Sequence, residues 1–161
     1  MKKKVAYFGV FTALALIFSY IESLIPINFG IPGAKLGLAN LMVIIALYKL
    51  GAKEAYVLSL TRIILSGFLF GNLFGILYSM AGGILSLTVM TLLKKTDKFS
   101  VVGISMAGAV FHNLGQLIIA GIVVESTNVI YYMPVLLLVG LATGFIIGII
   151  SSETIKRLRK I

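Results

Sequence analysis

Residues 73–98 read LFGILYSMAGGILSLTVMTLLKKTDK, a continuous apolar run that ends in a cluster of lysines. Its apolar part, Leu73–Leu93, matches the roughly 20 residues that an α-helix needs to cross the hydrocarbon core of a bilayer. Comparable runs recur along the chain, and none shows the alternation over about ten residues that β-barrel strands require. Because backbone groups in lipid must be satisfied within the segment, the chain is predicted to be an all-α integral membrane protein.

The composition supports the same class. The chain has 161 residues, 60% hydrophobic and 12% charged, with a mean hydropathy of +1.11. A water-soluble domain of this length needs more polar surface. The net charge of +9 lies beside the apolar runs, where it acts as a topology signal, so we expect a lipid bilayer and no nucleic acid as partner. With no cysteine, disulfides and thiolate chemistry are excluded.

A bundle of six transmembrane helices is predicted, forming a single domain over residues 1–161. The helices are expected at about Val5–Ile25, Leu36–Leu50, Ala55–Phe70, Leu73–Leu93, Ser100–Val124 and Val129–Ser151. The second helix is short. The loop before it, Pro26–Lys35, holds two of the three prolines and is apolar enough to fold back as a lid over an outward-facing cavity.

Positive charge falls almost entirely on one side of this arrangement. The other side carries only Lys35, and Arg62 lies within the third helix. The charged side holds Lys2, Lys3, Lys4, Lys49, Lys53, Lys94, Lys95, Lys98, Lys156, Arg157, Arg159 and Lys160. Because cytoplasmic segments carry such an excess of lysine and arginine, both termini are predicted to lie in the cytoplasm.

Rows of small residues predict close packing between helices. They recur every four residues at Gly140, Gly144 and Gly148, at Gly75, Ser79 and Gly83, and at Gly9 and Ala13. For Gly9 and Ala13 in the first helix, docking onto a partner subunit is the alternative to packing within the bundle.

The few polar side chains within the membrane are the candidate binding site, because such groups are costly in lipid and are usually functional or paired. They are Glu22, Asn40, Arg62, His112, Asn113 and Gln116, and Asn72 from the turn before the fourth helix and Lys35 from the outer loop join them as candidates. His112 and Gln116 are four residues apart and therefore share one face of the fifth helix.

Two interpretations of these residues stay open. Arg62 and Glu22 either form a structural ion pair, within a network that includes His112, or contact a ligand. Lys35 is either an anion contact or a lysine that extends its charge from a helix end into water. His112 and Gln116 favour a ligand role, since a histidine flanked by amides is unusual in lipid.

No catalytic or metal site is expected. Asp97 is the only aspartate, whereas prenyl-diphosphate chemistry holds Mg²⁺ through paired aspartates. The chain also has one histidine and no nucleotide-binding motif. We therefore expect no intrinsic cofactor, and ATP hydrolysis would need a separate subunit.

Four segments of the chain resemble one bacterial family, known both as Gx transporter and as heptaprenyl diphosphate synthase component I. They are residues 32–40 (PGAKLGLAN), 70–72 (FGN), 78–83 (YSMAGG) and 112–116 (HNLGQ). That family in turn resembles the substrate-binding S components of energy-coupling factor (ECF) transporters. The resemblance implies six helices, cytoplasmic termini in the bacterial cell membrane, and a cavity that opens outward beneath the loop after the first helix. It also implies that Gly9 and Ala13 dock on a coupling subunit.

Two functions follow from these observations. The first is a small-molecule-binding subunit of ECF type, which takes up a small anionic or amphipathic substrate with a separate coupling subunit and ATPases. The second is a non-catalytic membrane partner of a polyprenyl diphosphate synthase, or of flavin- and quinone-linked electron transfer. That role, implied by the family's other name and associations, would place a quinone, flavin or prenyl lipid in the cavity.

Overall fold

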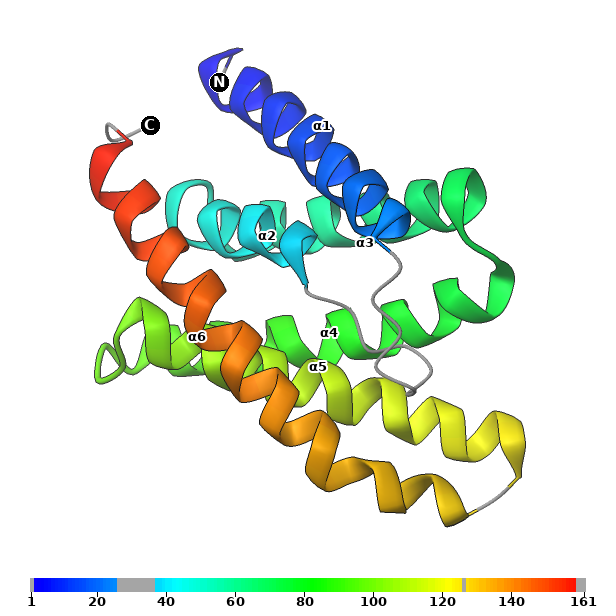
Figure 1. Ribbon diagram of the computed structural model, residues 1–161. Helices are drawn as coiled ribbons and strands as arrows, with labels where there is room; N and C mark the ends of the chain where they lie inside the picture. The colour runs from blue at the N-terminus through cyan, green and yellow to red at the C-terminus, as the bar shows by residue number, and fades with distance from the viewer. Residues whose placement is uncertain (1, 26–36, 126, 159–161) are drawn as a thin grey trace.

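The computed structural model of the chain describes residues 2–25, 37–125 and 127–158, and within these ranges all of its regular secondary structure is helical (Figure 1). The elements are α1 (Lys2–Leu24), α2 (Leu38–Lys49), α3 (Ala52–Phe70), α4 (Leu73–Lys95), α5 (Val101–Val124), a 3-10 segment η1 (Thr127–Tyr132) and α6 (Met133–Arg157). The all-α class and the six helices agree with the sequence prediction.

The predicted boundaries differ from the observed ones mainly at the ends of α6. The sequence predicts a helix at Val129–Ser151, but the first part of that run forms η1 and the helix continues through the basic Lys156 to Arg157. The predicted lid, Pro26–Lys35, lies outside the described residues, as does Leu36, the expected start of the second helix.

Four helical stretches are long and apolar enough to cross a membrane, namely Lys4–Leu24, Leu73–Lys95, Val101–Val124 and Asn128–Arg157. They make the chain a multi-pass membrane protein. Helix α2 has 12 residues and is therefore about 18 Å long, well short of a bilayer core of roughly 30 Å. Helix α3 has 19 residues but carries Lys53, Glu54 and Arg62.

The helices form two groups, with α1, α2 and α3 in one and α4, α5 and α6 in the other. In Figure 1, α2 and α3 lie side by side, as do α4 and α5, while α1 and α6 cross them at an angle. Contacts of α3 with α4 and of α2 with α6 join the groups. Among the described residues, helix α2 supplies more of the apolar core than any other helix, including the fully buried Ile44, Ile45 and Leu47.

Helices α5 and α6 approach closely along the predicted glycine row. A Cβ atom added to Gly144 would lie 2.7 Å from the Cα of Met106, and one added to Gly148 would lie 2.8 Å from the Cα of Val102. These separations are too short for a side chain, so only glycine fits. The packing role predicted for this row is confirmed.

One end of the bundle, which we call the lysine end, is held together by Lys4, Lys49 and Lys94. Lys4 pairs with Glu54 and so ties the start of α1 to the start of α3. The Nζ of Lys94 donates to the Leu47 carbonyl at 2.6 Å, and that of Lys49 donates to the Leu158 carbonyl at 2.7 Å. The first turn of α1 and the last turn of α6 therefore lie at the same end (Figure 1).

Candidate functional site

Two cavities lie where the two helix groups face each other. The first, the Ser105 cavity, is lined by Gly37, Asn40, Ile44, Ser86, Met90, Ser105, Gly108, Ala109, His112, Asn113, Gln116, Thr143, Gly144 and Ile147. The second, the Arg62 cavity, is lined by Ser19, Glu22, Ser23, Gly37, Asn40, Arg62, Ile63, Ser66, Gly67, Phe70, Gly71, Asn72, Gly75, Ser79, His112 and Gln116.

The two cavities share a boundary made by Asn40 and Gly37 of the α2 region and by His112 and Gln116 of α5. These polar side chains therefore face both spaces. The spacing argument from the sequence, which puts His112 and Gln116 on one face of a helix, is confirmed. The cavities are adjacent parts of one polar region between the helix groups.

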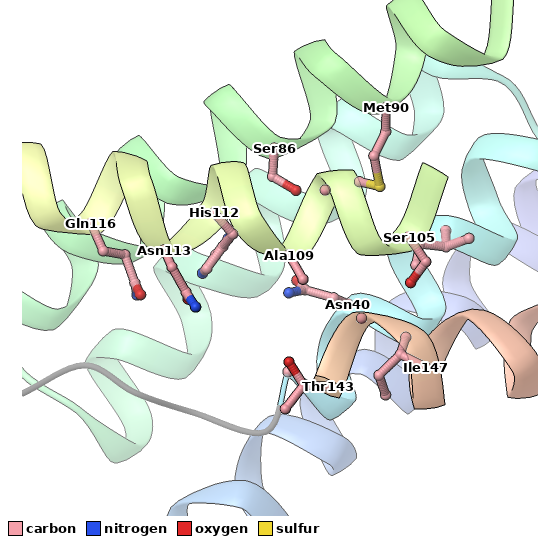
Figure 2. A pocket seen from close by; sticks show the side chains of 14 residues that line it. Asn40, Ser86, Met90, Ser105, Ala109, His112, Asn113, Gln116, Thr143 and Ile147 are labelled. Atoms are coloured by element: carbon pink, nitrogen blue, oxygen red, sulfur yellow. The ribbon is translucent and has the colours of Figure 1, made fainter. Parts of the chain in front are cut away.

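Figure 2 shows the side chains of His112, Asn113 and Gln116 projecting from one side of α5, with Asn40 and Thr143 reaching into the same space from α2 and α6. Gln116 is buried, with 9% of its surface exposed. Asn113 also has a structural role, because its Nδ2 donates to the Leu136 carbonyl of α6 at 2.7 Å. Of the three, His112 and Gln116 are the two that line both cavities.

Arg62 is buried in the middle of α3, with 8% of its surface exposed. Its Nη2 donates to the Asn40 Oδ1 at 3.0 Å, which links α3 to α2. Its Nε is buried and makes no hydrogen bond within the part of the chain that the structure describes. A buried guanidinium with a free N–H is costly in lipid, so this group is suited to receive a ligand atom.

Glu22 lines the Arg62 cavity but does not form the direct ion pair with Arg62 that one interpretation of the sequence expects. Among the described residues, the ion pairs within 4.0 Å are Lys4 with Glu54 and Lys156 with Glu153. The Oε1 of Glu22 instead accepts the backbone N–H of Gly37, whose φ of 76° is left-handed. This bond fixes the start of α2 against the end of α1.

The structure gives a different result for each of the remaining candidates, which are Asn72, Lys35 and the pair Gly9 and Ala13. Asn72 lines the Arg62 cavity and also caps α4, since its Oδ1 accepts the Gly75 N–H at 2.7 Å. Lys35 lies outside the described residues. Gly9 and Ala13 lie exposed on α1, and a Cβ added to Gly9 would meet nothing within 4 Å. This row therefore makes no close packing contact within the described bundle at Gly9.

Sequence reasoning missed the hydroxyl groups that line the cavities. Ser105 has 2% of its surface exposed, its Oγ has no hydrogen-bond partner, and it lines the Ser105 cavity with Ser86 and Thr143. The Oγ of Ser19 is likewise buried and unpartnered in the Arg62 cavity. Small hydroxyl residues are also common where membrane helices pack, so the sequence offers no signal that separates the two roles.

The cavity volumes are about 40 Å³ for the Ser105 cavity and about 70 Å³ for the Arg62 cavity. Each has room for a few water molecules, since a water needs roughly 10–15 Å³ by this measure. A larger molecule would require the two helix groups to move apart. The arrangement offers hydrogen bonds and one buried cation, and no cluster of metal-ligating side chains occurs in the described ranges.

Comparison with known proteins identifies a family. Residues 11–154 match the family model described as heptaprenyl diphosphate synthase component I, a stretch that includes every residue lining the two cavities. None of the curated proteins and none of the solved structures matches the chain.

Proposed function

This chain belongs to the heptaprenyl diphosphate synthase component I family, and we propose that it is a membrane-embedded subunit that binds a small molecule for uptake. In this proposal it acts as S components of ECF transporters do, with both termini in the cytoplasm and all six helices in the bilayer. Binding takes place from the outer side, and a separate ATPase module supplies the energy.

The observation that carries the proposal is the convergence of polar side chains from three helices on one space in an apolar bundle. Asn40, Arg62, His112 and Gln116 all line the Arg62 cavity, and two of them are buried. Purely structural polar groups in membrane helices pair with one another. Here the Nε of Arg62 and the Oγ of Ser19 have no partner among the described residues, which supports a site that receives a polar ligand.

The exposed row of small residues on α1 supports the part of this proposal that requires a coupling subunit as partner. Gly9 and Ala13 leave a shallow, open stretch of helix surface. Small residues of this kind allow the backbone of a second membrane helix to approach closely. In the proposal, this face of α1 docks on the coupling subunit that connects the protein to its ATPases.

A second candidate function rests on the description of the family. A membrane partner of a polyprenyl diphosphate synthase would hold a prenyl lipid, quinone or flavin without catalysing a reaction itself. The apolar side chains of Ile44, Met90 and Ile147 in the Ser105 cavity suit the hydrocarbon part of such a ligand. The proteins that copurify distinguish this function from uptake.

The site assignment is tested by the double substitution His112→Ala and Gln116→Ala. Wild-type protein is purified gently from its native membrane, the small molecules it releases on denaturation are identified, and their rebinding is measured. We expect the double variant to lose the bound compound. The control pair Tyr56→Phe and Thr88→Val removes a 2.7 Å polar contact between α3 and α4 that lies outside both cavities, and should leave binding unchanged. Equal binding by wild type and double variant would refute the assignment.

A further inference from the structure

The Arg62 cavity contains two opposite charges that do not touch. Arg62 from α3 and Glu22 from α1 both line it. The carboxylate of Glu22 lies within electrostatic reach of the guanidinium, yet no ion pair within 4.0 Å joins the two side chains. Opposite charges in a medium of low dielectric attract strongly. Their separation leaves a space with a cation on one side and an anion on the other.

Each charge has hydrogen-bonding capacity left over. Arg62 uses Nη2 to hold Asn40, while its buried Nε–H has no acceptor. Among the described residues, the hydrogen bond of the Glu22 carboxylate is the one that Oε1 accepts from the Gly37 N–H. The Oγ of Ser19 is also unpartnered beside this space. Within the described part of the chain, the cavity therefore offers an unused donor on the cation and a carboxylate with a second acceptor oxygen.

The net charge of the cavity favours some classes of ligand over others. Among the described residues that line the cavity, Arg62 and Glu22 are the charged side chains, and together they are neutral. A simple monoanion would leave one net negative charge among buried groups, and a simple cation would leave one net positive charge, both of which are costly in a membrane protein. A ligand that carries one charge of each sign keeps the cavity neutral and can satisfy both residues.

We propose that the Arg62 cavity binds a zwitterion, with the ligand's carboxylate on Arg62 and Ser19 and its ammonium group on Glu22. This inference rests on the proposed binding function and narrows its substrate class. The volume of about 70 Å³ holds roughly five water-sized groups, about the size of the ammonium and carboxylate ends of an α-amino acid, so binding of a whole amino acid requires the two helix groups to move apart. The ligand's side chain would extend past His112 and Gln116 toward the Ser105 cavity, which these residues also line.

The test compares matched probes on the purified full-length protein in lipid nanodiscs. The protein amino acids are screened by thermal stabilisation, and each one that binds is compared by calorimetry with its carboxylate and amine analogues, such as alanine with propionate and ethylamine. Hydrogen bonds to charged groups predict that removing either charge from the ligand weakens binding by about tenfold to a hundredfold.

The decisive variant is Glu22→Gln, which removes the negative charge while its amide oxygen can still accept the Gly37 N–H. We expect the affinity for the zwitterion to fall at least about tenfold and the affinity for the matching carboxylate to rise, because that ligand then neutralises Arg62. The matched control is Glu125→Gln, at the exposed residue that follows the last residue of α5 and lines neither cavity. It should leave both affinities unchanged.

Three results would overturn the inference: no amino acid binds, the carboxylate analogue binds wild type as tightly as the amino acid, or Glu22→Gln leaves the preference unaltered. The proposed function fails in a different way, when the compound released from native protein rebinds equally well to the His112→Ala and Gln116→Ala double variant. A native compound that depends on His112 and Gln116 but lacks a second charge would keep the function and refute the zwitterion.

Discussion

Replacing Asn40 with leucine tests how the buried cation is held. The Oδ1 of Asn40 accepts the Nη2 of Arg62 at 3.0 Å, the one hydrogen bond that the guanidinium makes to the described residues. Arg62 has 8% of its surface exposed, and its Nε is already without a partner. Leucine is similar in size to asparagine but cannot accept a hydrogen bond, so Asn40→Leu removes the hydrogen bond that the guanidinium makes to the described residues.

The expected cost follows from the type of bond that is lost. Hydrogen bonds to charged groups contribute about 1.5–3 kcal/mol. Water in the adjacent cavity of about 70 Å³ can solvate part of the guanidinium and lower the cost. We therefore expect Asn40→Leu to reduce the free energy of unfolding by about 2 kcal/mol.

A double-mutant cycle separates the loss of this bond from a simple change in packing. Removing Arg62 together with its partner eliminates the buried charge, and replacing both members of a buried polar pair by apolar groups is often neutral or stabilising. The variant Asn40→Leu with Arg62→Leu should therefore recover most of the stability lost by Asn40→Leu alone. Reversible unfolding by SDS in mixed micelles, followed by circular dichroism, measures each variant. The reasoning is refuted if Asn40→Leu matches wild type, or if the double variant is less stable than the single one.

Three further variants test a helix–helix packing contact, a helix cap and an ion pair. Gly144→Ala places a Cβ atom 2.7 Å from the Cα of Met106 and should cost about 1–3 kcal/mol in the same unfolding assay. Asn72→Ala removes the cap of α4 and should cost about 1 kcal/mol. The Lys4 ammonium lowers the pKa of Glu54, so the stability from this pair is present above the ordinary glutamate pKa and lost as pH falls through the lowered value. Lys4→Ala should flatten that acid-side loss.

Each of these variants has its own control or contrary outcome. Gly9→Ala meets nothing within 4 Å and should not destabilise the protein, so equal losses for Gly9→Ala and Gly144→Ala would contradict the packing account. Asn72→Asp keeps an acceptor for the Gly75 N–H and should retain the cap. An acid-side loss of stability that is the same with and without Lys4 would show that Glu54 titrates independently of the pair.

The helical class and most helix positions could be predicted because apolar runs and lysine clusters are strong local signals. The run Leu73–Leu93 predicts α4, which starts at Leu73 and ends at Lys95. The start of α6 could not be predicted, because hydropathy does not separate the 3-10 segment η1 from the α-helix that follows it. The depth of α2 in the bilayer could not be predicted either, because an apolar run as short as this helix gives no direct indication of how deeply it lies.

The candidate site could be predicted only in part. His112 and Gln116 stand out because amides and histidine are rare in an apolar helix, and their spacing of four residues fixes their common face. The partner of Arg62 could not be predicted, because the choice between Glu22 and Asn40 depends on how α1, α2 and α3 pack. Spacing along the chain carries no information on which of two helices comes within 3.0 Å of the guanidinium.

Native mass spectrometry of the protein, extracted gently from its own membrane, tests the central claim most directly because it reports bound subunits and bound small molecules together. The account predicts a complex with a membrane coupling subunit and ATPases, and a small polar molecule that is lost in the His112→Ala and Gln116→Ala double variant. A complex with a polyprenyl diphosphate synthase or with redox proteins, carrying a prenyl lipid, quinone or flavin, would contradict it.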